Sequence, residues 1–427
     1  MARATAATEP ENGAGVKTEE LPESVFFTSQ GDYFPPEYDR LRERAPIARL
    51  TTNTGDPVWY VTSHDWAREV LGDPRFSLSL THHEGVSQRD ELTIPPIGTS
   101  VVNRLTETGV RGEFMRHVGA GQTNVDEEWV RATGRDLLRR MKAGGAPADL
   151  CSAFAVPISL LVGARLLGLP EEDIDLFEEM VDKDLTFGGY SLEEREANMA
   201  RSQRYMRAHL HRERDEPSGL LDAIYDAGQR YAERYAAGTT GREPSAAPIT
   251  EDEYMNIAVS LFISTMGNPG ALLATGALAL MRHPEDARRL RERPELMSTA
   301  VDEILRYTLT MGGGLARVAR EDVPLGDALV RKGELVMVAT DAANYDPAVF
   351  PEPSRFDIER EGASAHLRFG GGRHHCPASQ LSRNMAAIGF GVLLEEVPTL
   401  RLAHPDEPVR WIEDRHVLMP RQLPVSW

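Results

Sequence analysis

Residues 368–383 read RFGGGRHHCPASQLSR, and they place one cysteine, Cys376, between a glycine-rich loop and the start of a predicted helix. Pro377 suits the first turn of a helix, because its missing N–H would have no partner there. The positive end of that helix is expected to lower the pKa of the Cys376 thiol and to favour the thiolate. The consecutive glycines before it allow the loop to approach a flat group closely.

Several interpretations of Cys376 are open on these residues alone. A lone cysteine is most often an inert residue of the core. A zinc site needs two to four ligands at regular spacing, and the sequence has neither a CxxC nor an HxxxH pair. A cysteine–histidine nucleophile needs two side chains that reach each other, which adjacent residues seldom do. A haem thiolate needs only one cysteine.

The composition limits the class of protein. The chain has 427 residues, 41% of them hydrophobic, which is enough to bury a large core and a deep ligand cavity. Acidic residues number 66 against 47 basic ones, and the formal charge of −19 argues against nucleic acid as a main partner. Only two cysteines occur, which excludes a disulfide framework and favours a reducing compartment.

The first residues and the apolar runs bear on location. Residues 1–20 are mostly small and polar, lack the apolar core of a signal peptide, and are predicted to form a disordered leader. No run of about 18 apolar residues predicts a membrane span. We therefore expect a cytoplasmic protein without a membrane partner, folded as a single domain over residues 21–427.

The hydrophobic pattern is helical through much of the chain. The longest predicted helix begins at a capping box of Thr250 and Glu253 and continues to His283, with a middle that is apolar nearly all round. Short strands are predicted at 46–63 and at 314–340, and a final helix directly follows the cysteine. The predicted fold class is mainly α with a minor β region.

Four motifs occur in order along the second half of the chain. EILR places Glu303 and Arg306 on one helical face, and LARVARED, AANYDPAVFPEPSRFDIER and FGGGRHHCPA follow it. In these motifs the sequence resembles the cytochrome P450 superfamily, of the soluble bacterial type, over nearly the whole chain after the leader. The resemblance implies a haem b group, bound between the long helix on its distal side and the cysteine loop.

The resemblance assigns roles to the residues that match the cysteine motif. It implies that Cys376 is the proximal thiolate ligand of the haem iron and that Phe369 and Gly370 belong to the haem-binding loop. His374 and Arg317 are implied contacts of the haem propionates, because both are donors suited to a carboxylate.

Two further groups follow from the same resemblance. Glu303, Arg306 and Arg355 are implied to form a structural ion-pair network behind the haem, rather than a catalytic group. Aligning MRHVGAGQT by pattern with the His-x-x-x-Arg propionate pair of the family places Arg111 at the histidine, and either Arg111 or Arg116 is an implied propionate contact.

The sequence departs from the family on the distal side. An acid and an alcohol usually organise protons there for O–O bond cleavage, and these positions fall on Gly267 and Asn268. Pro269 has no N–H to donate to the carbonyl of Thr265, so the helix is expected to kink or open. The freed carbonyl and the Asn268 amide are predicted to hold water or dioxygen. An equally weighted interpretation is that these residues make room for a bulky substrate.

The resemblance also places substrate and partner contacts. The substrate-facing segments contain Asn103, Arg104, Tyr190 and Arg415, together with His82 and His83. Their polarity favours a small molecule that is polar or carboxylate-bearing, aromatic or peptidic. Around the cysteine, a basic patch on an otherwise acidic protein is predicted to dock an acidic ferredoxin, and it consists of Arg368, Arg373, His375 and Arg383.

The function that the resemblance implies is a haem-thiolate monooxygenase or oxidase of bacterial secondary metabolism. It would use dioxygen and electrons from a ferredoxin and its reductase. The missing acid–alcohol pair leaves hydroxylation and oxidative or radical coupling both open. The alternatives are a peroxide-driven peroxygenase and a haem-binding sensor or carrier without turnover.

Overall fold

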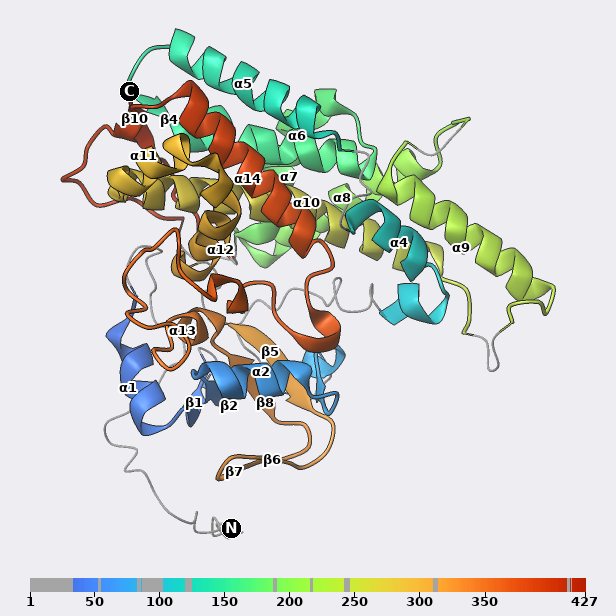
Figure 1. Ribbon diagram of the computed structural model, residues 1–427. Helices are drawn as coiled ribbons and strands as arrows, with labels where there is room; N and C mark the ends of the chain where they lie inside the picture. The colour runs from blue at the N-terminus through green and yellow to red at the C-terminus, as the bar shows by residue number, and fades with distance from the viewer. Residues whose placement is uncertain are drawn as a thin grey trace, which may run out of the picture.

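The computed structural model describes residues 34–52, 55–82, 86, 103–119, 125–186, 190–215, 218–241, 246–309, 314–412, 415 and 417–427. The leader predicted at 1–20 and His83 lie outside these residues. Figure 1 shows a larger helical part and a smaller part built around a sheet, which confirms the fold class predicted from the sequence.

The helical part contains most of the helices of the described chain, and the rest cover the sheet. They are α1 (Pro36–Arg44), α2 (His64–Gly72), α4 (Arg111–Val118), α5 (Glu127–Ala143), α6 (Val156–Leu167), α7 (Ile174–Leu185), α8 (Leu192–Leu210), α9 (Leu220–Ala236), α10 (Glu251–Arg282), α11 (Pro284–Glu292), α12 (Met297–Tyr307), α13 (Thr340–Asn344) and α14 (Ser379–Glu396), with a π-helical turn, η3 (Cys151–Ala155), before α6.

The strands form a main sheet and two smaller ones. The main sheet has the order β1-β2-β8-β5-β3, in which β2 and β8 are parallel and the other pairs antiparallel. Its strands are β1 (Ile47–Thr51), β2 (Pro57–Val61), β3 (Phe76–Ser77), β5 (Leu315–Ala319) and β8 (Leu335–Val338); the others are β4 (Ala148–Asp149), β6 (Val323–Leu325), β7 (Ala328–Val330), β9 (Arg401–Leu402) and β10 (Pro424–Ser426). The strands predicted at 46–63 and 314–340 are therefore present.

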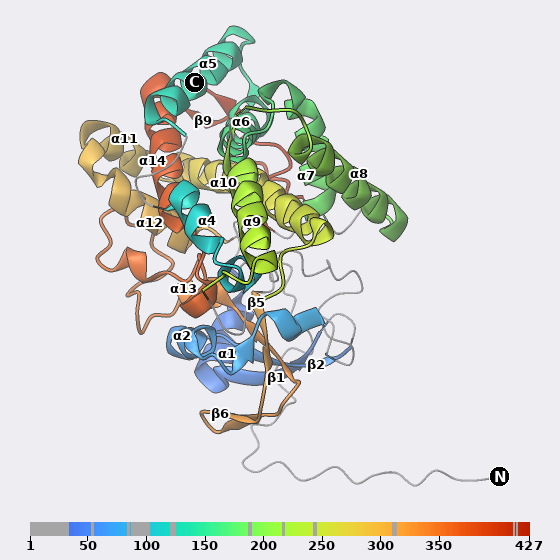
Figure 2. The same cartoon turned by 90° about the vertical axis from the view of Figure 1, so that its right-hand side faces the viewer.

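Helix α10 is the central element of the helical part. It is 32 residues long and packs against α6, α7, α8 and α14 (Figures 1 and 2). Of the described helices it is the one long and apolar enough to cross a membrane, but 67% of its apolar window is buried inside the protein. Its hydrophobicity is therefore that of a core helix, as the predicted burial implied.

The contact between α6 and α10 is unusually close because α6 carries a glycine there. A Cβ atom at Gly163 would lie 2.7 Å from Cγ of Met266 and 3.3 Å from the carbonyl oxygen of Thr265. Any larger residue would push the two helices apart. The backbone of α6 is thereby held against the segment of α10 that contains Pro269.

The N-terminus of α10 has the predicted capping box. The Thr250 hydroxyl accepts from the Glu253 N–H, and the Glu253 carboxylate accepts from the Thr250 N–H. The same carboxylate accepts from Arg104 Nε at 2.8 Å. One acidic side chain therefore caps the core helix and ties it to the segment that precedes α4.

We expect Thr250→Ala to lower the free energy of unfolding by about 1 kcal/mol, because it removes the oxygen that accepts from the Glu253 N–H. Thr250→Ser retains that oxygen and serves as the matched control. Chemical denaturation of the two variants beside the parent measures the difference. Equal stability of the alanine and serine variants would contradict the role of the cap.

Candidate functional site

The cysteine loop depends on two glycines with left-handed backbone. Gly370 has φ of 70° and Gly372 has φ of 61°, conformations that other residues rarely adopt. A Cβ atom at Gly372 would also lie 2.3 Å from the carbonyl oxygen of Leu71 in α2. The loop closes where the Cys376 N–H donates to the carbonyl of Phe369 at 2.9 Å. Local sequence therefore fixes the position of the cysteine against α2.

The predicted lowering of the Cys376 pKa is wrong for the protein chain alone. Burial raises the pKa of the Cys376 thiol, and the Ala378 N–H and the charge of Arg383 only partly oppose it. Helix α14 begins at Ser379, three residues after the cysteine rather than directly after it. A metal ion bound to the sulfur would oppose this effect and favour the thiolate.

A cluster of donors without acidic partners lies near the loop. Arg317 is 2% exposed, its Nε has no partner, and its Nη1 donates to the carbonyl of Ala316. In the described part of the chain no carboxylate pairs with it, and burial lowers its pKa to about 10. Burial also lowers the pKa of His374 to about 4, and the charge of Arg317 adds to this effect. His374 is therefore neutral near pH 7.

Arg368, on the cysteine loop, is half-buried and has other surroundings. Its Nη1 donates to the carbonyl of Thr308 at 2.9 Å, and burial lowers its pKa to about 10, against a smaller raising effect of Asp341. A buried cation without a counterion is costly. Arg317 and neutral His374 thus form a donor pair suited to a ligand that bears carboxylates.

The same geometry changes the predicted basic docking patch. Arg368 points inward, and Arg383 donates to Asp302 at 2.6 Å while its guanidinium lies 4.8 Å from the ring centroid of Phe369. Arg373 and His375 are exposed. The patch predicted from four residues is therefore reduced to these two, because sequence proximity to the cysteine does not determine which way a side chain points.

A buried ion-pair cluster lies behind the loop. Glu303 and Arg306 are fully buried on α12, and the carboxylate accepts from Arg306 Nε at 2.7 Å and from Nη2 at 2.8 Å. The third member is Arg360, whose Nε donates to both oxygens of Glu303. Each charge is thus paired, as burial requires.

Arg355, which the sequence predicted in this cluster, does not supply its side chain. That side chain is 61% exposed and pairs with Glu352 and Asp357. Its backbone carbonyl instead accepts from Arg306 and Arg360. The motif containing Arg355 also contains Arg360, but only the fold of the loop shows which arginine turns inward.

Helix α10 continues as one α-helix through Pro269, the residue at which the sequence predicted a kink or opening. Pro269 cannot donate to Thr265, and one residue later the hydroxyl of Ser159 in α6 accepts from the Gly270 N–H at 3.0 Å. The same hydroxyl donates to the carbonyl of Met266 at 2.6 Å. Ser159 therefore adds a hydrogen bond from α6 to each of two backbone groups of α10 beside Pro269. Nothing in the sequence of α10 itself indicates this residue.

The three predicted catalytic residues have different surroundings. Asn268 is exposed, whereas Gly267 is buried. A Cβ atom at Gly267 would lie 2.2 Å from Cδ1 of Leu185 and 3.1 Å from Cγ1 of Val181, both in α7. The hydroxyl of Thr265 donates to the carbonyl of Leu261 at 2.7 Å within the helix. Of the three, Asn268 offers the side chain that is open to a ligand.

The two predicted propionate contacts on α4 are both exposed, and one of them is in an ion pair. Arg116 forms an ion pair with Glu113 and its side chain is 62% exposed. Arg111, the first residue of α4, is also exposed. In the described part of the chain, neither forms a hydrogen bond or ion pair with Arg317 or His374. Both assignments stay predictions.

Arg104, predicted to contact substrate, is a structural residue in this fold. It donates to Glu253, to Glu107 and to the carbonyls of Ala247 and Pro248, so its donors are used to hold the N-terminus of α10. Asn103 is half-buried and stays a predicted substrate contact. The side chain of His82 and all of His83 lie outside the described residues.

The other two predicted substrate residues meet on one carboxylate. Arg415 Nη1 donates to Asp182 of α7 at 2.7 Å, and the Tyr190 hydroxyl donates to the same carboxylate at 3.1 Å. The Arg415 side chain is 7% exposed, and its Nε has no partner. The sequence missed Asp182, because a carboxylate on an ordinary helix carries no signal of its distant partners.

Comparison with known proteins places this geometry in a family. The cytochrome P450 family model matches residues 278–422. Mycocyclosin synthase of Mycobacterium tuberculosis is 31% identical over 403 residues, which cover 94% of this chain and 98% of the relative. The chain belongs to the cytochrome P450 family.

Two further proteins extend the comparison. Pentalenic acid synthase of Streptomyces avermitilis is 34% identical, covering 92% of this chain and 95% of the relative. The crystal structure of SgvP, a putative thioether synthase in the tailoring step of griseoviridin, has a TM-score of 0.80 and 28% identity, with 94% of this chain and 98% of that chain covered. The P450 described here is therefore an oxidoreductase with relatives in bacterial secondary metabolism.

Family membership implies a cysteine-ligated haem, and the residues of this P450 fit one. The orphaned Nε of buried Arg317 and the neutral imidazole of His374 are suited to the two carboxylates of a haem. Gly370 and Gly372 give the loop before the cysteine its left-handed backbone and add no side chains to it. Among the described residues no group of three or more histidine, cysteine or acidic side chains could hold a metal ion by itself.

Replacing Arg360 is expected to be far more damaging than replacing Arg355. Arg360→Ala leaves one buried arginine for Glu303, and breaking a buried pair costs about 3–5 kcal/mol. Arg355→Ala removes exposed pairs worth about 1 kcal/mol or less. Thermal or chemical denaturation measures both, and haem retention provides a second readout. A larger loss for Arg355→Ala would contradict the assignment of the cluster.

Proposed function

We propose that this P450 oxidises a small natural-product substrate with dioxygen and electrons from a ferredoxin-type protein, using haem b held by Cys376. The observation that carries the proposal is the donor pair of Arg317 and His374 beside the cysteine loop. Buried Arg317 donates to a backbone carbonyl and pairs with no carboxylate in the described part of the chain.

Each of the site residues has its own proposed role. Cys376 holds the iron, and Arg317 and His374 bind the propionates. When bound, a cysteine-ligated haem activates dioxygen and oxidises the substrate. Asn268, exposed on α10, offers an amide donor and acceptor to water or dioxygen on the distal side. Gly267 keeps that side free of any ionisable side chain.

The distal helix bears on the type of reaction. With neither acid nor hydroxyl at 267 and 268, this P450 lacks the relay on which oxygen insertion ordinarily relies. Mycocyclosin synthase, pentalenic acid synthase and the putative thioether synthase SgvP are all named for the bonds or products that they make. These names support oxidative coupling beside hydroxylation as the reaction of this chain.

The substrate is proposed to contact the group formed by Asp182, Tyr190 and Arg415. A carboxylate, a phenol and a guanidinium in one place favour a molecule with polar or charged substituents. For the electron donor, exposed Arg373 and His375 on the cysteine loop support the docking of an acidic ferredoxin.

The alternatives make different predictions for turnover. A peroxygenase would form product with hydrogen peroxide but not with dioxygen and a ferredoxin. A haem sensor or carrier would bind haem and form no product with either oxidant. Product formation from a library of aromatic and peptidic natural products, under each oxidant separately, distinguishes the three.

The ligand assignment is tested by comparing the two cysteines. The reduced, carbon-monoxide-bound protein is expected to show the red-shifted Soret band of a thiolate ligand, and Cys376→Ala is expected to abolish it. Cys151→Ala is the matched control, because Cys151 is 3% exposed and donates to the carbonyl of Pro420. Survival of the band in Cys376→Ala would overturn the assignment.

A further inference from the structure

A hollow of about 270 Å³ lies between the C-terminal parts of α10 and α14, and α11, which packs beside both helices, closes one side of it (Figures 1 and 2). Its lining is mainly apolar. The buried members of the lining are Ala277, Leu280, Ala287, Leu393, Leu394 and Val397. The hollow is remote from the distal site, because Ala277 follows Asn268 by nine residues of one helix, which is roughly 13 Å along its axis.

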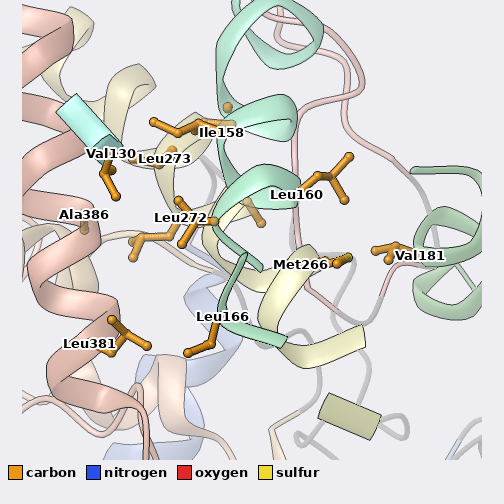
Figure 3. Close-up of a cluster of buried hydrophobic side chains, with 14 of the residues drawn as sticks. Val130, Ile158, Leu160, Leu166, Val181, Met266, Leu272, Leu273, Leu381 and Ala386 are labelled. Carbon is orange, nitrogen blue, oxygen red and sulfur yellow. The ribbon is translucent and has the colours of Figure 1, made fainter. Parts of the chain in front are cut away.

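The hollow forms because α10 and α14 cross closely just before it. Figure 3 shows Leu273 of α10 and Ala386 of α14 in one buried cluster. A Cβ atom at Gly389 of α14 would lie 2.6 Å from Cδ2 of Leu273, so only a glycine permits this approach. Two helices that cross at an angle separate beyond the point of contact. The small side chains of Ala277 and Ala287 do not fill the space that results.

The open side of the hollow carries arginines. Arg288, Arg291 and Arg401 line the hollow and are exposed, in contrast to its buried aliphatic floor. The charge of Arg288 is already paired, because its guanidinium contacts the carboxylates of both Glu285 and Glu292. Any attraction for an anion must therefore come from the other two.

Arg291 and Arg401 pair with no carboxylate in the described part of the chain. Arg291 Nη1 donates to the carbonyl of Pro398 at 2.7 Å, and Arg401 Nη1 donates to the carbonyl of Thr399 at 3.3 Å. A guanidinium has five N–H donors, so each of these side chains has further donors to offer a ligand. The hollow thus combines an aliphatic floor with two cations, on a protein whose formal charge is −19.

This combination selects a small anion with an apolar body. A cavity of about 150 Å³ lined by aliphatic and aromatic side chains binds benzene, so the larger hollow has room for an alkyl chain of medium length. Arginine binds a carboxylate through two parallel hydrogen bonds. A second copy of the chain fits the hollow poorly, because a symmetric contact centred on it would bring the arginines of the two copies together.

We propose that the hollow is a binding site for a medium-chain alkyl carboxylate. The alkyl chain lies against Leu280, Leu393 and Val397, and the carboxylate accepts hydrogen bonds from Arg291 and Arg401. Binding is reversible and makes no covalent bond. The site is separate from the distal side and from the haem, so this proposal and the proposed function stand or fall independently.

The charge requirement is tested by titrating the haem-loaded protein with octanoate in a calorimeter at low ionic strength. Octanamide has a chain of the same length without the charge, and we expect it to bind about fivefold more weakly or worse, because it cannot form charge-assisted hydrogen bonds. Arg291→Gln is expected to weaken octanoate binding by about the same factor. Arg288→Gln is the matched control and is expected to leave the affinity unchanged, since Glu285 and Glu292 already neutralise Arg288.

The location of the ligand is tested by filling the hollow. Ala287→Phe places a ring on its floor and is expected to weaken octanoate binding about tenfold or more. Thr399→Trp acts from the open side, where Thr399 is exposed and the fold tolerates a larger side chain, and is expected to have the same effect. Octanoate held on the distal side of the haem instead would be insensitive to both changes and would shift the Soret band.

Four outcomes would overturn the site. They are no heat of binding in the parent protein, octanamide bound as tightly as octanoate, an equal loss in Arg288→Gln and Arg291→Gln, and octanoate binding that survives in Thr399→Trp. Sedimentation of the parent and of Thr399→Trp examines the remaining occupant. A dimeric parent beside a monomeric Thr399→Trp would assign the hollow to a second copy of the chain and reject the carboxylate.

Discussion

The buried carboxylate of Glu303 is the interaction on which the haem side of the structure depends. Two arginines neutralise it, and Arg306 also donates to the carbonyl of Asn344. The Asn344 side chain in turn accepts from the N–H of Leu367, which directly precedes the cysteine loop. A charge in the core thus fixes the loop through consecutive hydrogen bonds. Such a charge is tolerated only because each partner is present.

The distal side depends on packing rather than on charge. Glycines at 163 and 267 let α6 and α7 approach α10 until no further side chain fits between them. At the same place Pro269 has no N–H to donate to the carbonyl of Thr265, and the Ser159 hydroxyl bonds to the backbone of Met266 and Gly270 on either side of the proline. A hydroxyl from the adjoining helix thus adds polar contacts where the two helices pack closely.

The sequence predicted what depends on local spacing. The two residues of the capping box, Thr250 and Glu253, are three positions apart, and so are Glu303 and Arg306. Helical geometry alone therefore brings the members of each pair together. Contacts between distant residues were missed. Arg104 meets Glu253 across 149 positions, and the choice of Arg360 over Arg355 depends on a loop that no periodicity describes. The Cys376 pKa was misjudged because burial cannot be read from a helix start.

The contact between α7 and α10 leaves no space for an acidic side chain at position 267. Leu185 occupies the space that a side chain at 267 would need, and Val181 flanks it. An acid introduced at Gly267 alone would therefore displace α7 before it could act, so a functional relay would require a smaller residue at 185 as well. The same contact leaves a cavity beside Gly267, lined by Val181 and Asp182. The packing that excludes an acidic side chain at 267 thus leaves an open space next to the same residue.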